Sequence, residues 1–148
     1  MLRADGSANP KWIAADLLSQ AEHDPRAAVF LITPDKDFGL AVQKEMEKQM
    51  KELSRYEIMK SSVDQYAKAF LCKDAEQCFD IVNKIAPEHL EVELPDPKKY
   101  LPLIYNAGAI FLGKYTSERS GITWRAPTIH CPPPVPLLSP RPLGFMIL

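Results

Sequence analysis

The stretch NPKWIAADLLSQAEH, residues 9–23, predicts one amphipathic helix around which the rest of the chain is organised. Asn9 is suited to cap the first turn, and Pro10 suits the first helical position, where a missing N–H leaves no hydrogen bond unmade. At about 100° per residue, one arc of this helix carries only aliphatic side chains: Ile13, Ala14, Leu17, Leu18 and Ala21. The helix therefore has one face to bury.

A polar pair, Gln20 and His23, lies beside this arc near the end of the predicted helix. The two residues are three apart, so both side chains can point to one object. Glutamine is a poor metal ligand compared with histidine, cysteine or a carboxylate, and a histidine at a helix end is usually a surface residue. From the residues alone, a ligand pair and a plain solvent-facing turn both remain open.

The rest of the chain alternates between predicted strands and helices. Short apolar runs predict strands at residues 27–33, 67–72 and 109–113, and alternation predicts another at 90–94 with Glu91 and Glu93 on a wet face. Helical spacing predicts further helices at residues 35–50, 54–66, 74–86 and 97–105. This order predicts an α/β, Rossmann-like layered fold with a mostly parallel sheet.

Composition narrows the class of protein. The 148 residues suffice for one domain with a core, and a net charge of −1 indicates neither a nucleic-acid nor a membrane surface. No apolar run reaches the roughly 20 residues of a membrane helix, and the first residues lack a signal pattern, so we expect a cytoplasmic protein. The three cysteines show no metal-binding spacing, and no glycine-rich phosphate loop is present.

Composition changes abruptly near Glu118. Residues 119–148 hold 7 of the 14 prolines and contain neither Asp nor Glu. We therefore divide the chain into an α/β domain at residues 1–118 and a proline-rich tail at 119–148, which we expect to be extended or disordered.

A second polar pair stands in APEHL, residues 86–90, between a predicted helix and a predicted strand. A histidine beside a carboxylate can exchange protons near neutral pH, so Glu88 and His89 are candidates for acid/base chemistry. Adjacency in sequence does not fix geometry, and a simple polar turn is the alternative.

Three motifs together resemble histidinol dehydrogenase: residues 9–23, residues 86–90, and NAGAIFLG at residues 106–113. Their order and intervals also resemble that family, over roughly residues 4–118. The resemblance implies two NAD-dependent oxidations that convert L-histidinol to L-histidine, one zinc per site, and a homodimer.

The resemblance also implies roles for the two polar pairs. Gln20 and His23 would bind zinc and contact the substrate, and zinc would orient the substrate's nitrogens. His89 would contact the substrate and take the alcohol proton, and Glu88 would help to activate water for attack on the aldehyde. It assigns no cofactor-binding residue here.

The chain departs from the family beyond Glu118. The family continues with Gly-Asp-Tyr and Asn-His-x-Leu-Pro, whose Asp is a third zinc ligand, whereas this chain has Ile122 at that position; a fourth ligand comes from the partner chain. Reading residues 119–132 one nucleotide out of register permits both strings, so we expect a frame-shifted tail. We expect an internal fragment that is inactive alone; a non-catalytic α/β binding or assembly module is the alternative.

Overall fold

The computed structural model describes residues 2–113, 124–125 and 145–147. Its helices are α1 (Pro10–Ala21), α2 (Lys36–Met50), α3 (Tyr56–Tyr66), α4 (Ala75–Ile85) and the 3-10 helix η1 (Pro97–Leu103). Its strands are β1 (Leu2–Ala4), β2 (Phe30–Thr33), β3 (Lys68–Leu71), β4 (His89–Glu93), β5 (Ala109–Leu112), β6 (Trp124–Arg125) and β7 (Phe145–Ile147).

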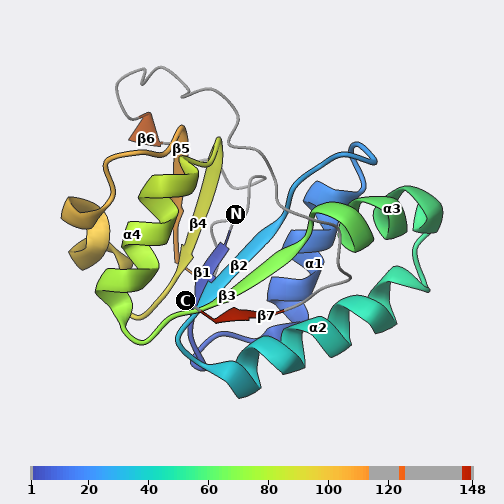
Figure 1. The fold of residues 1–148 in the computed structure, drawn as a ribbon, viewed down its shortest axis with the longest axis horizontal. Coiled ribbons are helices and arrows are strands. Elements are labelled where there is room, and N and C mark those ends of the chain that lie inside the picture. Colours follow the sequence, from blue (N-terminus) through green and yellow to red (C-terminus); the bar gives the residue numbers. More distant parts are fainter. Residues whose placement is uncertain (1, 114–123, 126–144, 148) are drawn as a thin grey trace.

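The strands form one sheet in the order β6-β5-β4-β1-β2-β3-β7, and every neighbouring pair is parallel except β5 and β6 (Figure 1). The chain moves from β1 to β3 in one direction, then crosses back and adds β4 and β5 on the other side of β1. This reversal between β1 and β4 is the doubly wound arrangement. It confirms the predicted α/β fold with a mostly parallel sheet.

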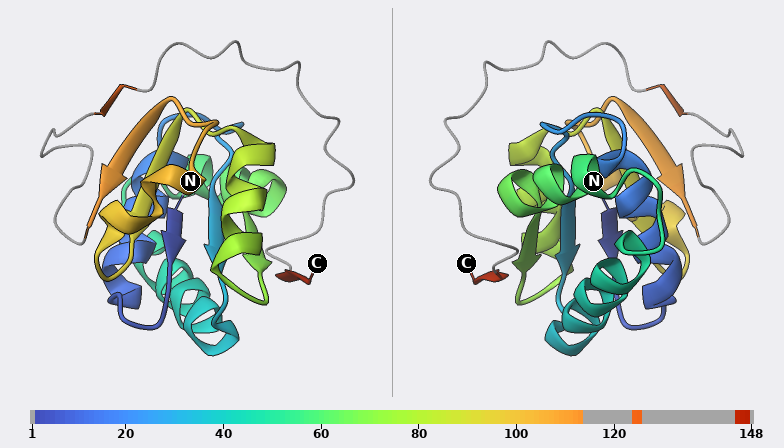
Figure 2. Two further views of the ribbon diagram at one scale, coloured as in Figure 1. Left: turned by 90° about the vertical axis from the view of Figure 1, so that its left-hand side faces the viewer. Right: turned by 90° about the vertical axis from the view of Figure 1, so that its right-hand side faces the viewer.

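Helices cover both faces of the sheet. Figure 2 shows α4 and η1 nearest the viewer from one side, and α2 and α3 nearest from the other. Side chains alternate along a strand, so neighbouring residues of β2 pack into two different hydrophobic clusters, one on each face of the sheet. Leu31 packs with residues of α1, α2 and α3, whereas Ile32 packs with residues of α4. Strands covered on both faces read as continuous apolar runs, which is why they were recognisable in the sequence.

Short polar side chains begin three of the helices. The side-chain oxygens of Asn9, Asp35 and Asp74 accept hydrogen bonds from backbone N–H groups in the first turns of α1, α2 and α4, at 3.0, 3.0 and 2.8 Å. The aliphatic arc of α1 is buried as predicted. The helix ends at Ala21 rather than His23, so the predicted range was two residues too long.

The prediction of a wet face on β4 was wrong. Glu91 and Glu93 are only 8% and 6% exposed. In the register of the sheet Glu93 lies beside Ala4, and Ala4 packs with residues of α1. Because residues paired across parallel strands share a face, both glutamates lie on the face that α1 covers. Alternating charge was therefore mistaken for exposure to solvent.

Two strands come from the predicted tail. β6 pairs with β5 and β7 pairs with β3, so they occupy the two edges of the sheet. The other positions of the tail, including Ile122, lie outside the described residues. The expectations of an extended or disordered tail and of a frame shift over residues 119–148 stay predictions.

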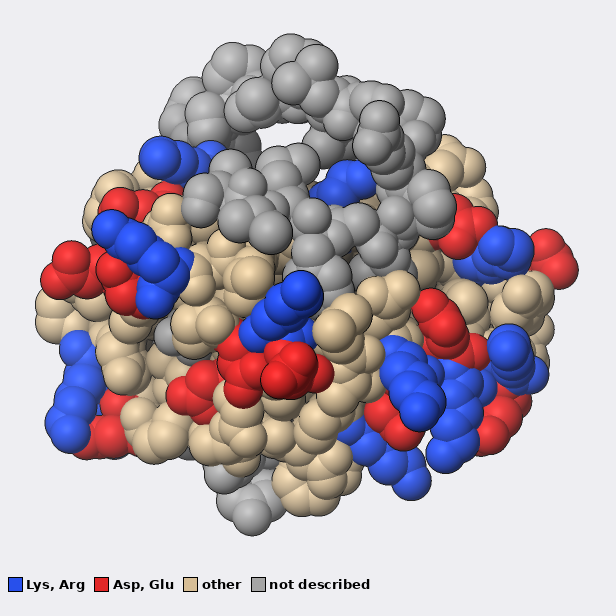
Figure 3. Space-filling view, turned by 60° about the horizontal axis from the view of Figure 1, so that its bottom comes forward, with Lys and Arg blue, Asp and Glu red and all other residues tan. Residues whose placement is uncertain are grey.

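Charges of both signs are mixed over the surface. On the face in Figure 3, lysine and arginine side chains alternate with acidic ones. Lys60 binds Asp64 at 2.5 Å and Lys99 binds Asp96 at 2.7 Å. In each pair the hydrogen bond to the aspartate, strengthened by its charge, raises the pKa of the lysine. Across the part of the chain that the structure describes, no helix combines the length and apolarity that spanning a bilayer requires.

Candidate functional site

The first candidate pair lies where α1 runs into the loop before β2. Gln20 is in the last turn of the helix and half-buried, whereas His23 follows the helix and is exposed. The backbone N–H of His23 donates to the carbonyl of Gln20 at 3.3 Å. This tight turn keeps the two residues together although His23 is no longer helical.

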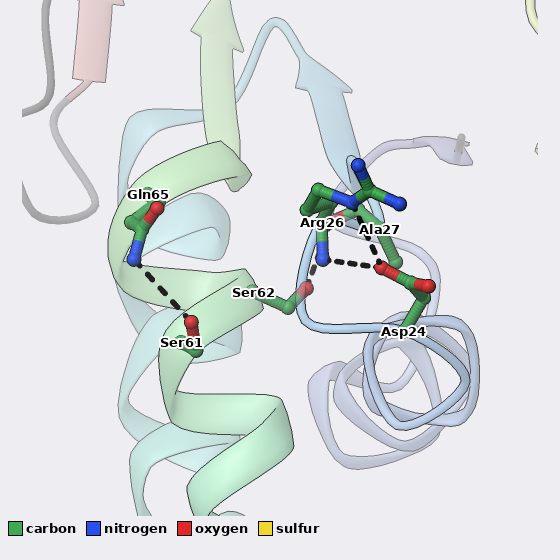
Figure 4. Close-up of polar contacts among 6 residues, drawn as sticks. All are labelled: Asp24, Arg26, Ala27, Ser61, Ser62 and Gln65. Atoms are coloured by element: carbon green, nitrogen blue, oxygen red, sulfur yellow. Dashed lines mark hydrogen bonds and ion pairs between the residues drawn. The ribbon is translucent and has the colours of Figure 1, made fainter.

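The loop after His23 is held in place by its own polar residues (Figure 4). Asp24 Oδ1 accepts a hydrogen bond from the backbone N–H of Arg26 at 2.7 Å, and the carbonyl of Asp24 accepts one from Ala27 at 2.9 Å. The buried hydroxyl of Ser62, from α3, donates to the carbonyl of Ala27 at 2.8 Å. The loop that begins with His23 is thereby anchored to α3.

The second candidate pair lies in the turn from α4 into β4. The helix ends at Ile85 and is capped by Ala86, which takes a left-handed conformation with φ of 51°. Pro87 is buried, Glu88 is exposed and His89 is half-buried as the first residue of β4. The imidazole of His89 meets the ring of Phe111 edge-on, with 6.0 Å between ring centres. The turn therefore presents a carboxylate to solvent beside a partly sheltered imidazole, a combination suited to proton transfer.

The backbone around Glu88 is clasped by the start of β5. The N–H of Gly108 donates to the carbonyl of Pro87 at 2.9 Å, and the N–H of Ala109 donates to the carbonyl of Glu88 at 2.7 Å. A Cβ added to Gly108 would lie 2.6 Å from the carbonyl oxygen of Glu88. Glycine is needed here because no side-chain atom fits between the two backbones. The NAGAIFLG motif of residues 106–113 thus supports the turn that carries Glu88 and His89.

Both pairs lie on one edge of the sheet. Leu2 of β1 pairs with Leu31 of β2 on one side and with Glu91 of β4 on the other. Two residues before these partners, Val29 and His89 therefore stand at the same height of the sheet. Two strand spacings put these positions about 10 Å apart. The loop from α1 and the turn from α4 both lie along the upper edge of the sheet in Figure 1.

This edge holds the amino ends of the parallel strands, whereas ligands of doubly wound folds usually bind at the carboxyl ends. The two pairs remain on separate elements. Within residues 2–113 and the two short strands beyond them, no three His, Cys, Asp or Glu side chains gather as a metal cluster would.

The carboxyl edge is poorly suited to a dinucleotide. Between β1 and α1, Gly6 is approached by the carboxylate of Asp35, whose Oδ2 would lie 2.6 Å from an added Cβ. Asp5 Oδ1 accepts a hydrogen bond from the backbone N–H of Ser7 at 2.9 Å. These two carboxylates occupy the loops where a Rossmann fold presents backbone N–H groups to a pyrophosphate. The described residues therefore do not fit NAD at this edge, in line with the missing glycine-rich motif.

The chain is similar to known proteins of one family. A family profile described as histidinol dehydrogenase matches residues 1–131, beyond the 4–118 expected from the motifs. Histidinol dehydrogenases of Aquifex aeolicus and Listeria monocytogenes are each 48% identical to this chain, over 118 and 124 residues that cover 80% and 84% of it. The crystal structure of histidinol dehydrogenase from Elizabethkingia anophelis superposes with a TM-score of 0.78 at 34% identity and covers 82% of the chain. The chain spans only 28%, 29% and 28% of these three proteins.

Proposed function

Because the chain belongs to the histidinol dehydrogenase family, we propose that it contributes residues to a site that oxidises L-histidinol to L-histidine. In this proposal Glu88 and His89 are the acid/base pair, and Gln20 and His23 bind zinc and substrate. The observation that carries it is the placement of both pairs on the amino edge of one sheet. The homodimer implied by the resemblance is part of the same proposal.

Glu88 and His89 divide the proton transfers. When bound, a nicotinamide cofactor would accept the hydride of each oxidation. In the first oxidation the imidazole of His89 takes the hydroxyl proton of the alcohol. The aldehyde then adds water, and the exposed carboxylate of Glu88 receives a proton from that water. The resulting hydrate anion would become the carboxylic acid when it loses its hydride in the second oxidation. His89 is half-buried, and the edge-on contact with Phe111 helps to orient its ring.

Gln20 and His23 fit zinc in part. They offer one amide oxygen and one imidazole nitrogen, which is half of a tetrahedral shell. When bound, zinc would supply a Lewis-acidic centre that orients the nitrogens of the substrate. The remaining ligands would come from outside the described residues. Members of the family generally depend on NAD as well, and we assign no NAD-binding residue in this chain.

Zinc titration tests the ligand pair. We expect the 148-residue chain to bind zinc weakly, because two ligands do not close a coordination shell. Isothermal titration calorimetry should show this binding, and His23→Ala should remove it. His130→Ala should have no effect, because the predicted frame shift of the tail leaves this histidine outside the site. A tight site that survives His23→Ala would overturn the ligand pair and favour a non-catalytic α/β module.

A further inference from the structure

We propose that Asn83 is a positioning residue for Glu88 and His89, acting through the loop before β5. The inference rests on the proposed function, because it matters for the reaction only if Glu88 and His89 carry the chemistry. Asn83 lies in the last turn of α4 and is only 4% exposed. Its side chain binds backbone groups of the loop between η1 and β5, so an effect on the two candidate residues passes through that loop.

The side chain of Asn83 binds three backbone groups of one loop. Its Nδ2 donates to the carbonyl of Leu103 at 2.8 Å, and its Oδ1 accepts from the N–H groups of Tyr105 and Asn106 at 3.0 and 3.2 Å. In addition, the side-chain Nδ2 of Asn106 donates to the backbone carbonyl of Asn83 at 3.1 Å. Four hydrogen bonds therefore fasten the end of α4 to the loop between η1 and β5.

The amide group suits this position because it is both a donor and an acceptor. Aspartate has the same shape and could still accept from two N–H groups, but when ionised it has no hydrogen to offer Leu103. Alanine would leave two N–H groups and one carbonyl without their partner in a largely buried place, which is costly. The environment thus requires both ends of the asparagine side chain.

The loop that Asn83 holds continues into the residues that bind the backbone of Pro87 and Glu88. Two residues after Asn106, Gly108 binds Pro87 and the next residue binds Glu88, both through backbone hydrogen bonds. Residues 83–89 and 103–109 are therefore tied together at both ends, by Asn83 at one and by Gly108 at the other. If the bonds of Asn83 are lost, the loop can move, and the backbone of Glu88 and the ring of His89 lose their fixed position.

Hydrogen exchange and histidine NMR of the full 148-residue chain test this. With Asn83→Ala, the Gly108 and Ala109 amides should exchange about tenfold faster, as expected from losing hydrogen bonds worth about 1.4 kcal/mol net. The Cys72 amide, which bonds to Thr33 at 3.0 Å, should change less than about twofold. The ring signals of His89 should shift toward unstructured values, while those of His23 stay in place.

Two further variants separate positioning from general stability. Asn9→Ala removes one capping bond at the far end of α1 and should leave the exchange of Gly108 and the His89 signals unchanged. Asn83→Asp keeps the acceptor and should restore part of the protection at Gly108. If Asn83→Ala does not fold, Asn106→Ala removes a single bond of the same network and should give a smaller effect at the same sites.

The proposal is overturned if all amides, including that of Cys72, exchange faster to the same extent, because Asn83 would then only stabilise the fold. It is equally overturned if Gly108, Ala109 and the His89 signals do not change. Zinc, substrate and cofactor are absent from this measurement. Failure to bind zinc would therefore count against the proposed function alone. Unchanged exchange of the Gly108 and Ala109 amides would count against the positioning role of Asn83 alone.

Discussion

Single residues decide whether the turn of Glu88 holds its shape. Gly108→Ala should lower the free energy of unfolding by about 1–3 kcal/mol, because its Cβ meets a backbone carbonyl that cannot rotate away. Urea unfolding followed by circular dichroism measures this loss. Gly6→Ala is the matched control, since its Cβ meets the side chain of Asp35, which can turn aside. Equal losses in the two variants would contradict the idea of a rigid clasp.

At the same scale, the sequence and the structure identify different residues. Gln20, His23, Glu88 and His89 stood out because they belong to recognisable motifs, and no geometry was needed to find them. Asn83 did not stand out, because its partners are backbone groups some twenty residues away and carry no sequence signal. An asparagine beside the apolar stripe of α4 was the only hint available.

Elements were predictable where their signals are local. Capping residues and helical spacing located α1, α2 and α4, since those interactions lie within a few residues. β1 was missed because three residues are too few to show a period. The burial of Glu91 and Glu93 was missed because a sequence pattern cannot show that a helix packed elsewhere in the chain covers both.

One hydrogen bond between elements is expected to hold the loop that follows His23. Ser62→Ala should lower the free energy of unfolding by about 1 kcal/mol, because the carbonyl of Ala27 loses its partner in a partly buried place. Ser61→Ala, one residue away, removes only an exposed contact with Gln65 at 3.3 Å and should change stability by less than about 0.5 kcal/mol. Thermal unfolding of the two variants gives the comparison; indistinguishable curves would show that the anchor to α3 is dispensable.

For the whole molecule, we expect the 148-residue chain alone to form no NADH from histidinol. Its described residues assemble no three-ligand metal cluster, and two carboxylates stand where a dinucleotide phosphate would be bound. Absorbance of NADH in the presence of histidinol, zinc and NAD provides the measurement, with intact Aquifex aeolicus histidinol dehydrogenase as the positive control. Turnover that His89→Ala abolishes would prove this expectation wrong.

The position of both candidate pairs at the amino ends of the strands also sets the sign of the local electric field. In a parallel sheet the helices run opposite to the strands, so α1 and α4 both end at this edge. The carboxyl terminus of a helix carries about half a unit of negative charge from its aligned peptide dipoles. Two such termini attract cations. A divalent metal and a substrate with a protonated amine both suit this edge, whereas a phosphate does not.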